Sequence, residues 1–100
     1  MGRLAIWAQL EAKPGKEKEV EEFLKSAQPL AEREKETIRW YAIKMGPGKY
    51  AIFDTFADEN GRSAHLNGEI AKALAAKASD LFATAPDIAK PEILASKAGR

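Results

Sequence analysis

The most informative chemical group in this sequence is an acid inside an apolar segment. Asp54 lies in Tyr50–Phe56 (YAIFDTF), whose β-branched and aromatic residues predict a strand. A carboxylate at a central position of such a strand is costly to bury unless it has a partner. His65, the single histidine of the chain, is the available partner, because the short helix expected to hold it leads from this strand back over the sheet. A carboxylate beside an imidazole can move protons near neutral pH.

A hairpin should bring a tyrosine to the same place. Thr37–Met45 (TIRWYAIKM) predicts a second strand, and the GPGK segment that follows it is a strong hairpin signal. With the Pro-Gly pair as the tight turn, Tyr41 pairs with Asp54. Residues directly opposite each other share a face of the sheet. We therefore expect Tyr41 and Asp54 to face the helices, and Trp40 and Phe53 to point the other way.

Each of these residues also has a purely structural interpretation. Asp54 can form a hydrogen bond or an ion pair with Arg62 or Arg39 and thereby anchor a loop, since structural ion pairs also explain buried acids. His65 can be an ordinary helix residue that packs beside Leu66, with hydrogen-bond partners for its ring nitrogens and no chemical role. Tyr41 can be a core aromatic with its hydroxyl on a backbone carbonyl. These alternatives make the spatial arrangement of the three residues the decisive observation.

The composition excludes several other classes of protein. The chain has 100 residues and no cysteine, which excludes a disulfide scaffold, an iron–sulfur cluster, a zinc finger and a thiol nucleophile. It has no glycine-rich phosphate loop, no nucleophile elbow and no histidine pair at metal spacing. A formal charge of +1 argues against a nucleic-acid partner, and no apolar run is long enough to span a membrane. We expect one soluble cytoplasmic domain over residues 1–100, with no metal.

The remaining segments complete the predicted order of strands and helices. The predicted elements are a strand over Leu4–Ala12, a helix over about Lys16–Glu34 that contains Pro29, strands over Thr37–Met45 and Tyr50–Phe56, a short helix ending at Leu66, a second helical stretch from Asn67 to about Phe82, and a weaker closing strand over Asp87–Ser96. The order β-α-β-β-α-β predicts a ferredoxin-like α+β fold. In this fold an antiparallel four-stranded sheet carries its helices on one face.

The other face of such a sheet has no helices to cover it. Trp7, Trp40 and Phe53 are expected on this face, which is too apolar to remain in contact with water. A second copy of the chain, packed sheet against sheet, would cover it. The sequence therefore predicts a homodimer with these three residues in the interface.

The whole chain resembles the antibiotic biosynthesis monooxygenase (ABM) family of dimeric α+β barrels. Lys13–Lys16 (KPGK) and the helix after it resemble the family's Pro-Gly turn and first helix, and Thr37–Tyr41 resembles its second strand, where a tyrosine is common. The most specific match is Tyr50–Phe56, followed by Asp58-Glu59 and Ala64–Leu66. These segments are similar to the family's acid–x–aromatic strand end and to the Ala-His on its next helix.

The resemblance implies an oxygenase that needs no metal, flavin or haem. Its substrate would be a small phenol or hydroquinone, which supplies its own electrons to molecular oxygen once it is deprotonated. His65 would be the base or proton shuttle, Asp54 would orient its ring, and Tyr41 would donate a hydrogen bond to the substrate oxygen. The position of His65 near a helix start would keep the imidazole neutral and able to accept a proton. The residues expected to line the substrate pocket are Phe56, Leu66, Ile70, Leu74 and Phe82.

The sequence also departs from the family pattern. The family often has Glu and Trp at the positions of Asp54 and Phe56, so the acid is shorter here and the indole donor is absent. Haem-degrading relatives use an asparagine on the first strand, whose helix-side residues in this chain are Ile6, Ala8 and Leu10. Haem degradation is therefore disfavoured.

Two other functions fit the same fold. One is a non-catalytic dimeric module that binds a small hydrophobic ligand or acts in a stress response. The other is an isomerase or lyase acting on a small carbonyl compound, in which His65 would move a proton without oxygen. Anaerobic turnover would separate the second from an oxygenase.

Overall fold

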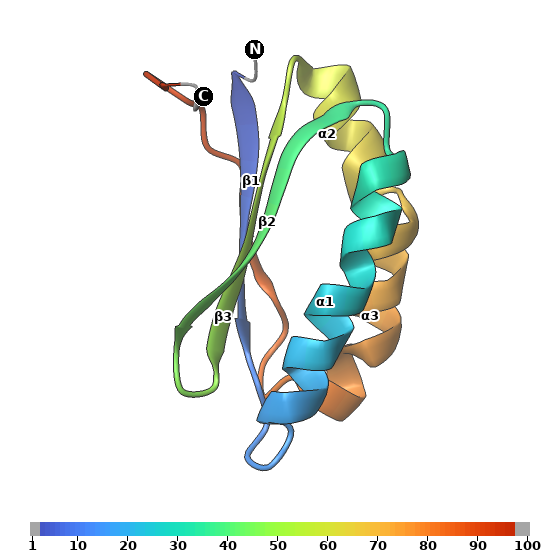
Figure 1. Ribbon diagram of the computed structural model, residues 1–100, viewed down its shortest axis with the longest axis vertical. Coiled ribbons are helices and arrows are strands. Elements are labelled where there is room, and N and C mark those ends of the chain that lie inside the picture. Colours follow the sequence, from blue (N-terminus) through green and yellow to red (C-terminus); the bar gives the residue numbers. More distant parts are fainter. Residues whose placement is uncertain (1–2, 98–100) are drawn as a thin grey trace.

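The computed structural model describes residues 3–97 and has the predicted order of elements. Its strands are β1 (Leu4–Glu11), β2 (Thr37–Gly46), β3 (Lys49–Phe56) and β4 (Asp87–Ala89), and its helices are α1 (Glu17–Arg33), α2 (Glu59–Leu66) and α3 (Glu69–Leu81). The strands form one antiparallel sheet in the order β2-β3-β1-β4. All three helices lie on the same face of that sheet (Figure 1). The prediction of a ferredoxin-like α+β fold is confirmed.

The core forms where the alternating faces of β1 and β3 meet the apolar stripe of α1. β1 and β3 pair along their whole length, and this register places Ile6 beside Asp54 and Ala8 beside Ile52. The apolar side chains on this face are buried against Val20 and Leu24 of α1. The helix-side face of the central strands is therefore closed to solvent, and any polar group on it lies in a dry environment.

The hairpin between β2 and β3 has a different register from the predicted one. Gly46 pairs with Lys49, and the next pair is Lys44 with Tyr50, so that Met45 is an extra residue in a β-bulge. The loop residues are Pro47 and Gly48. Proline fixes a negative φ, which excludes the turns whose twist matches a hairpin best. A bulge beside the turn adjusts the twist and adds one residue to its strand.

This bulge reverses the predicted faces of two aromatic residues. A shift of one residue moves every side chain of a strand to the opposite face. Trp40, not Tyr41, lies opposite Asp54, and its ring packs against the helix-side core. Tyr41 lies on the open face, 46% exposed, with its ring stacked on Phe53 at 6.4 Å between centroids. The predictions that Tyr41 faces the helices and that Trp40 lies on the open face are both wrong.

The closing strand is shorter than predicted. β4 ends at Ala89, two residues before Pro91, which has no backbone N–H to donate. The chain nevertheless continues beside β1: the Ala5 amide donates to the Pro91 carbonyl, and the Ile93 amide donates to the Arg3 carbonyl. Within residues 3–97, no helix is both long enough and apolar enough to cross a lipid bilayer.

Candidate functional site

Asp54 lies in the middle of the sheet, beneath the helices. Its neighbours across the sheet are Ile6 on β1 and Trp40 on β2, and its exposed fraction is 0%. Oδ1 has no hydrogen-bond partner among the described residues, and Oδ2 has the neighbouring His65 as its one charged contact there. Burial raises the pKa of Asp54, and the neighbouring His65 only partly offsets this effect. The site therefore contains a desolvated carboxylate that still has acceptor capacity.

His65 reaches Asp54 from α2, whose start is fixed by a capping residue. Asp58 precedes the helix, and its side chain accepts a hydrogen bond from the Gly61 amide at 2.9 Å. From the last turn of α2, Nε2 of His65 lies 2.8 Å from Oδ2 of Asp54. The ring of Phe56 packs beside the imidazole, with the centroids 5.3 Å apart. The predicted contact between His65 and Asp54 is confirmed.

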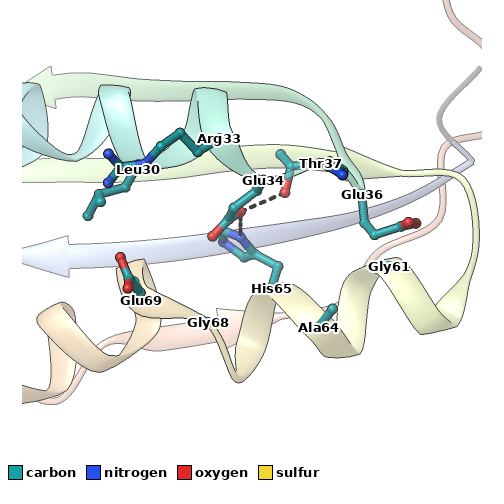
Figure 2. Close-up of a pocket in the computed structure, with 11 residues that line it drawn as sticks. Leu30, Arg33, Glu34, Glu36, Thr37, Gly61, Ala64, His65, Gly68 and Glu69 are labelled. Carbon is teal, nitrogen blue, oxygen red and sulfur yellow. Dashed lines mark hydrogen bonds and ion pairs between the residues drawn. The ribbon is translucent and has the colours of Figure 1, made fainter.

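A second carboxylate, from Glu34, holds the other nitrogen of the imidazole. Glu34 is the residue that follows α1, and its Oε1 lies 2.6 Å from Nδ1 of His65 (Figure 2). The hydroxyl of Thr37 donates to the same oxygen at 2.7 Å. Gly68 leaves space for this carboxylate, because a Cβ at that position would lie 3.2 Å from Oε2 of Glu34. Thus Glu34, His65 and Asp54 form a continuous chain of contacts, which we call the triad.

The triad favours the charged form of the imidazole. Burial lowers the pKa of His65, but Asp54 and Glu34 outweigh burial, and the net shift is upward from the ordinary value of 6.5. His65 lies in the last turn of α2, where the helix dipole also favours a positive charge. The expectation that a helix start keeps this histidine neutral is therefore wrong. A charged His65 donates from both nitrogens, which leaves Asp54 as the proton acceptor of the site.

An apolar cavity of about 200 Å³ adjoins Asp54 and His65 between the sheet and the helices α2 and α3. We call it the inner cavity; its lining residues are Ile6, Ala8, Ile52, Asp54, His65, Leu66, Ala71, Leu74, Ala75, Pro86 and Ile88. Apart from the two members of the triad, every one of these side chains is apolar. An apolar cavity of roughly 150 Å³ can hold a benzene molecule, so the inner cavity is suited to a single substituted ring.

The predicted pocket residues divide into two groups. Leu66 and Leu74 line the inner cavity. Phe56, Ile70 and Phe82 are buried in the core instead and do not line it. Of the predicted pocket residues, only those that face Asp54 form the cavity wall.

A second cavity, of about 350 Å³, lies on the Glu34 side of the imidazole (Figure 2). We call it the outer cavity; its lining residues are Leu30, Arg33, Glu34, Lys35, Glu36, Thr37, Gly61, Ala64, His65, Gly68 and Glu69. Glu34 keeps 20% of its side chain exposed here, so its carboxylate is in contact with solvent. His65 is thus the one residue that lines both cavities.

Glu34 was not among the candidate residues derived from the sequence. It belongs to the charged segment Glu32–Glu36, a composition typical of a solvated helix end. A signal was nevertheless present. The buried positions Val20, Leu24, Ala27 and Ala31 of α1 are three or four residues apart, and Glu34 continues that spacing. A charged residue on the buried stripe of a helix needs a partner inside.

Comparisons with known proteins relate this chain to solved structures. No protein-family model and no curated protein sequence matches it. The NE2512 protein of unknown function from Nitrosomonas europaea is 51% identical, with a TM-score of 0.96, and the match covers 100% of this chain and 97% of that one. A "putative antibiotic biosynthesis monooxygenase" from the same organism has a TM-score of 0.81 at 13% identity, over 92% of this chain and 99% of its own. A Caulobacter crescentus structure of the same description has a TM-score of 0.78 at 22% identity, over 94% and 92%. The last two likenesses concern the fold.

Proposed function

Because this chain belongs to one family with the NE2512 protein and has the fold of the antibiotic biosynthesis monooxygenases, we propose that it oxidises a small phenol or hydroquinone with molecular oxygen and without a cofactor. The observation that carries the proposal is the fully buried Asp54 carboxylate at the wall of an apolar cavity: Oδ2 contacts His65, and Oδ1 has no hydrogen-bond donor among the described residues. A ligand hydroxyl would supply the missing donor, and the aromatic ring would fill the apolar space.

In this reaction Asp54 accepts the hydroxyl proton of the substrate. The O–H bond breaks, a new O–H bond forms on the carboxylate, and the electron-rich phenolate reacts with oxygen. One oxygen atom enters the ring at a carbon that loses its hydrogen, and the other leaves as water, so that a phenol becomes a quinone. The substrate supplies all four electrons. The positive charge of His65 at 2.8 Å favours the ionised form of Asp54 and so partly offsets the effect of burial, which raises the pKa of this carboxyl.

Oxygen consumption measures this activity directly. We expect uptake above the rate of spontaneous oxidation with single-ring hydroquinones, and poor uptake with substrates of several fused rings. Asp54→Asn should lower the rate by a factor of about 10² or more, because it removes the proton acceptor and keeps the shape. Tyr41→Phe is the matched control and should keep full activity, since Tyr41 lies on the other face of the sheet. Full activity in Asp54→Asn would overturn the proposal.

The same cavity would serve the two other candidate functions. Ligand-induced thermal stabilisation without oxygen uptake would identify a binding module. Turnover of a small carbonyl compound under anaerobic conditions would identify an isomerase or lyase. Both outcomes would replace the oxygenase proposal while retaining Asp54 and His65 as the ligand site.

We also propose that two copies of the chain pack through the open faces of their sheets. An aromatic row crosses this face: the rings of Trp7 and Phe53 are 6.3 Å apart, and Tyr41 stacks on the other side of Phe53. The row runs across β1, β3 and β2. A twofold axis through it would pack the row of one copy against the same row of the other. Tyr41 thus replaces Trp40 in the proposed interface.

A further inference from the structure

We propose that Glu34 is the proton outlet of the site, through which the buried Asp54–His65 pair exchanges protons with solvent. The proposal deepens the proposed function, since it assigns a positioning and proton-transfer role to a residue that does not touch the inner cavity. It rests on the arrangement of the two cavities around a single imidazole. Oxidation of a phenol requires proton movement at a fully buried carboxylate, and that movement needs a route to solvent.

Asp54 has no direct contact with solvent. Its carboxylate is fully buried, and within residues 3–97 its ion-pair contact is with His65. A ring in the inner cavity would occupy the space on the cavity side of the carboxylate. Once a ligand is bound, Asp54 can therefore exchange protons with water through His65.

The two nitrogens of the imidazole face two different carboxylates. Nε2 faces Asp54 at 2.8 Å and Nδ1 faces Glu34 at 2.6 Å, so the ring connects the two carboxylates at opposite edges. A proton that leaves Nδ1 breaks the N–H bond and forms an O–H bond on Oε1 of Glu34. The partly exposed carboxyl then passes the proton to water in the outer cavity. The reverse sequence returns it, and no redox partner is needed.

Other charged side chains lie near the imidazole without pairing with it among the described residues. Arg33, Lys35 and Glu36 line the outer cavity from the segment around the end of α1, and Glu69 lines it from α3. None of these four forms an ion pair with His65 within residues 3–97. Glu36 offers a matched control, because it is a glutamate on the same cavity without contact to the ring.

Nuclear magnetic resonance of the single histidine tests the outlet without any turnover. In the wild-type protein with ¹⁵N-labelled histidine, saturation of the water signal should attenuate the Nδ1 proton more strongly than the Nε2 proton, because Nδ1 leads to solvent. Faster exchange at Nε2 would show that protons leave through the inner cavity, which would overturn the proposal. This measurement needs no variant and so does not depend on the folding of one.

Substitution of the outlet residue gives a second readout. Glu34→Gln keeps an oxygen acceptor for Nδ1 but cannot take its proton, and the His65 pKa should fall by about one unit or more because one of two neighbouring negative charges is lost. Exchange of the Nδ1 proton should slow in the same variant. Glu36→Gln should change neither quantity, and Glu34→Asp should restore part of both. A Glu34→Gln protein that folds and titrates like the wild type would contradict the role of Glu34.

The outcomes separate this inference from the proposed function. If exchange and titration behave as expected but no phenol is oxidised, the outlet stands and the oxygenase proposal fails. If phenols are oxidised but the Glu34→Gln histidine is unchanged, the oxygenase stands and the outlet fails. If both hold, the pH profile of oxygen uptake should shift in Glu34→Gln in the same direction as the His65 pKa and remain unchanged in Glu36→Gln.

Discussion

At the scale of single residues, the protein binds a proton more tightly when folded than when unfolded. The pKa of His65 is raised from its ordinary value of 6.5 because two carboxylates outweigh the effect of burial. The charged form is held by contacts at both nitrogens, and it is lost with the fold. Protonation of His65 is therefore linked to the free energy of unfolding.

This linkage predicts how stability depends on pH. The contribution of His65 is fully present below pH 6.5 and is lost as the pH rises through the raised pKa of the folded state. Over that interval the unfolding free energy should fall by up to about 1.4 kcal/mol per pH unit for the one proton involved. Urea denaturation at a series of pH values checks this. His65→Gln should flatten the dependence in this interval, and an unchanged slope would show that another group is responsible.

The contact between His65 and Asp54 predicts a strong asymmetry between single and double substitutions. His65→Leu leaves Asp54 buried without its partner and should cost about 3–5 kcal/mol of unfolding free energy near neutral pH. His65→Leu combined with Asp54→Leu replaces the pair with apolar groups and should recover most of that loss. Equal losses in the single and the double variant would mean that the pair does not interact energetically. Chemical denaturation of both proteins gives the comparison.

Residue patterns predicted two members of the triad but not the third. The apolar run around Asp54 and the single histidine were sufficient to predict their contact, because a buried carboxylate needs a partner and only one imidazole was available. Glu34 lies in a run of charged residues that looks like a solvated loop. Its role depends on where α1 ends and on the space left by Gly68, and both are properties of packing.

At the scale of elements, the short helix α2 determines where the imidazole lies. The helix has eight residues, too few to be stable alone, and its first turn is fixed by the side chain of Asp58 on the Gly61 amide. Its last turn carries His65. The position of the His65 imidazole thus depends on a cap at the other end of the same helix.

We expect the removal of that cap to lower stability measurably. Asp58→Ala should cost about 1 kcal/mol, which corresponds to a decrease in Tm of about 4–8 °C for a domain of this size. Asp80→Ala is the control, since Asp80 is exposed in the last turn of α3 and caps no helix start. Thermal denaturation followed by circular dichroism measures both. A larger loss in Asp80→Ala than in Asp58→Ala would contradict the capping role.

The elements themselves were largely predictable, but the hairpin register was not. The strands and helices follow from apolar periodicity, and the order of strands in the sheet follows from the fold class. The bulge at Met45 follows from the mismatch between a proline-containing turn and the twist of the strands, which periodicity does not report. That one residue decided whether Trp40 or Tyr41 would face Asp54.

At the scale of the whole molecule, one face of the sheet is covered by helices and the other is bare (Figure 1). The bare face carries the aromatic row formed by Trp7, Phe53 and Tyr41. Burial of such an apolar surface is favourable, and the same face of a second copy of the chain can bury it. The proposed sheet-to-sheet dimer would remove this aromatic row from water.

Tyr41 offers the cleanest test of the dimer. The wild-type protein should have about twice the mass of one 10.9 kDa chain in light scattering coupled to size-exclusion chromatography. Tyr41→Asp places a charge in the row and should yield folded monomers, because the side chain is half exposed in the single chain. Tyr41→Phe keeps the ring and should remain dimeric. A wild-type protein that is monomeric at high micromolar concentration would rule out the sheet-to-sheet dimer.

The two tryptophans, on opposite faces of the sheet, give the molecule two separate fluorescent reporters. Trp40 lies under the helices, opposite Asp54, and its buried indole N–H has no hydrogen-bond partner in the part of the chain that the structure describes. Trp7 lies in the aromatic row on the bare face. A protein with Trp7→Phe would emit from the helix side alone and respond to a ring bound near the acid. A protein with Trp40→Phe would emit from the bare face and respond to dilution. Emission spectra could thus follow ligand binding and self-association separately, without an added dye.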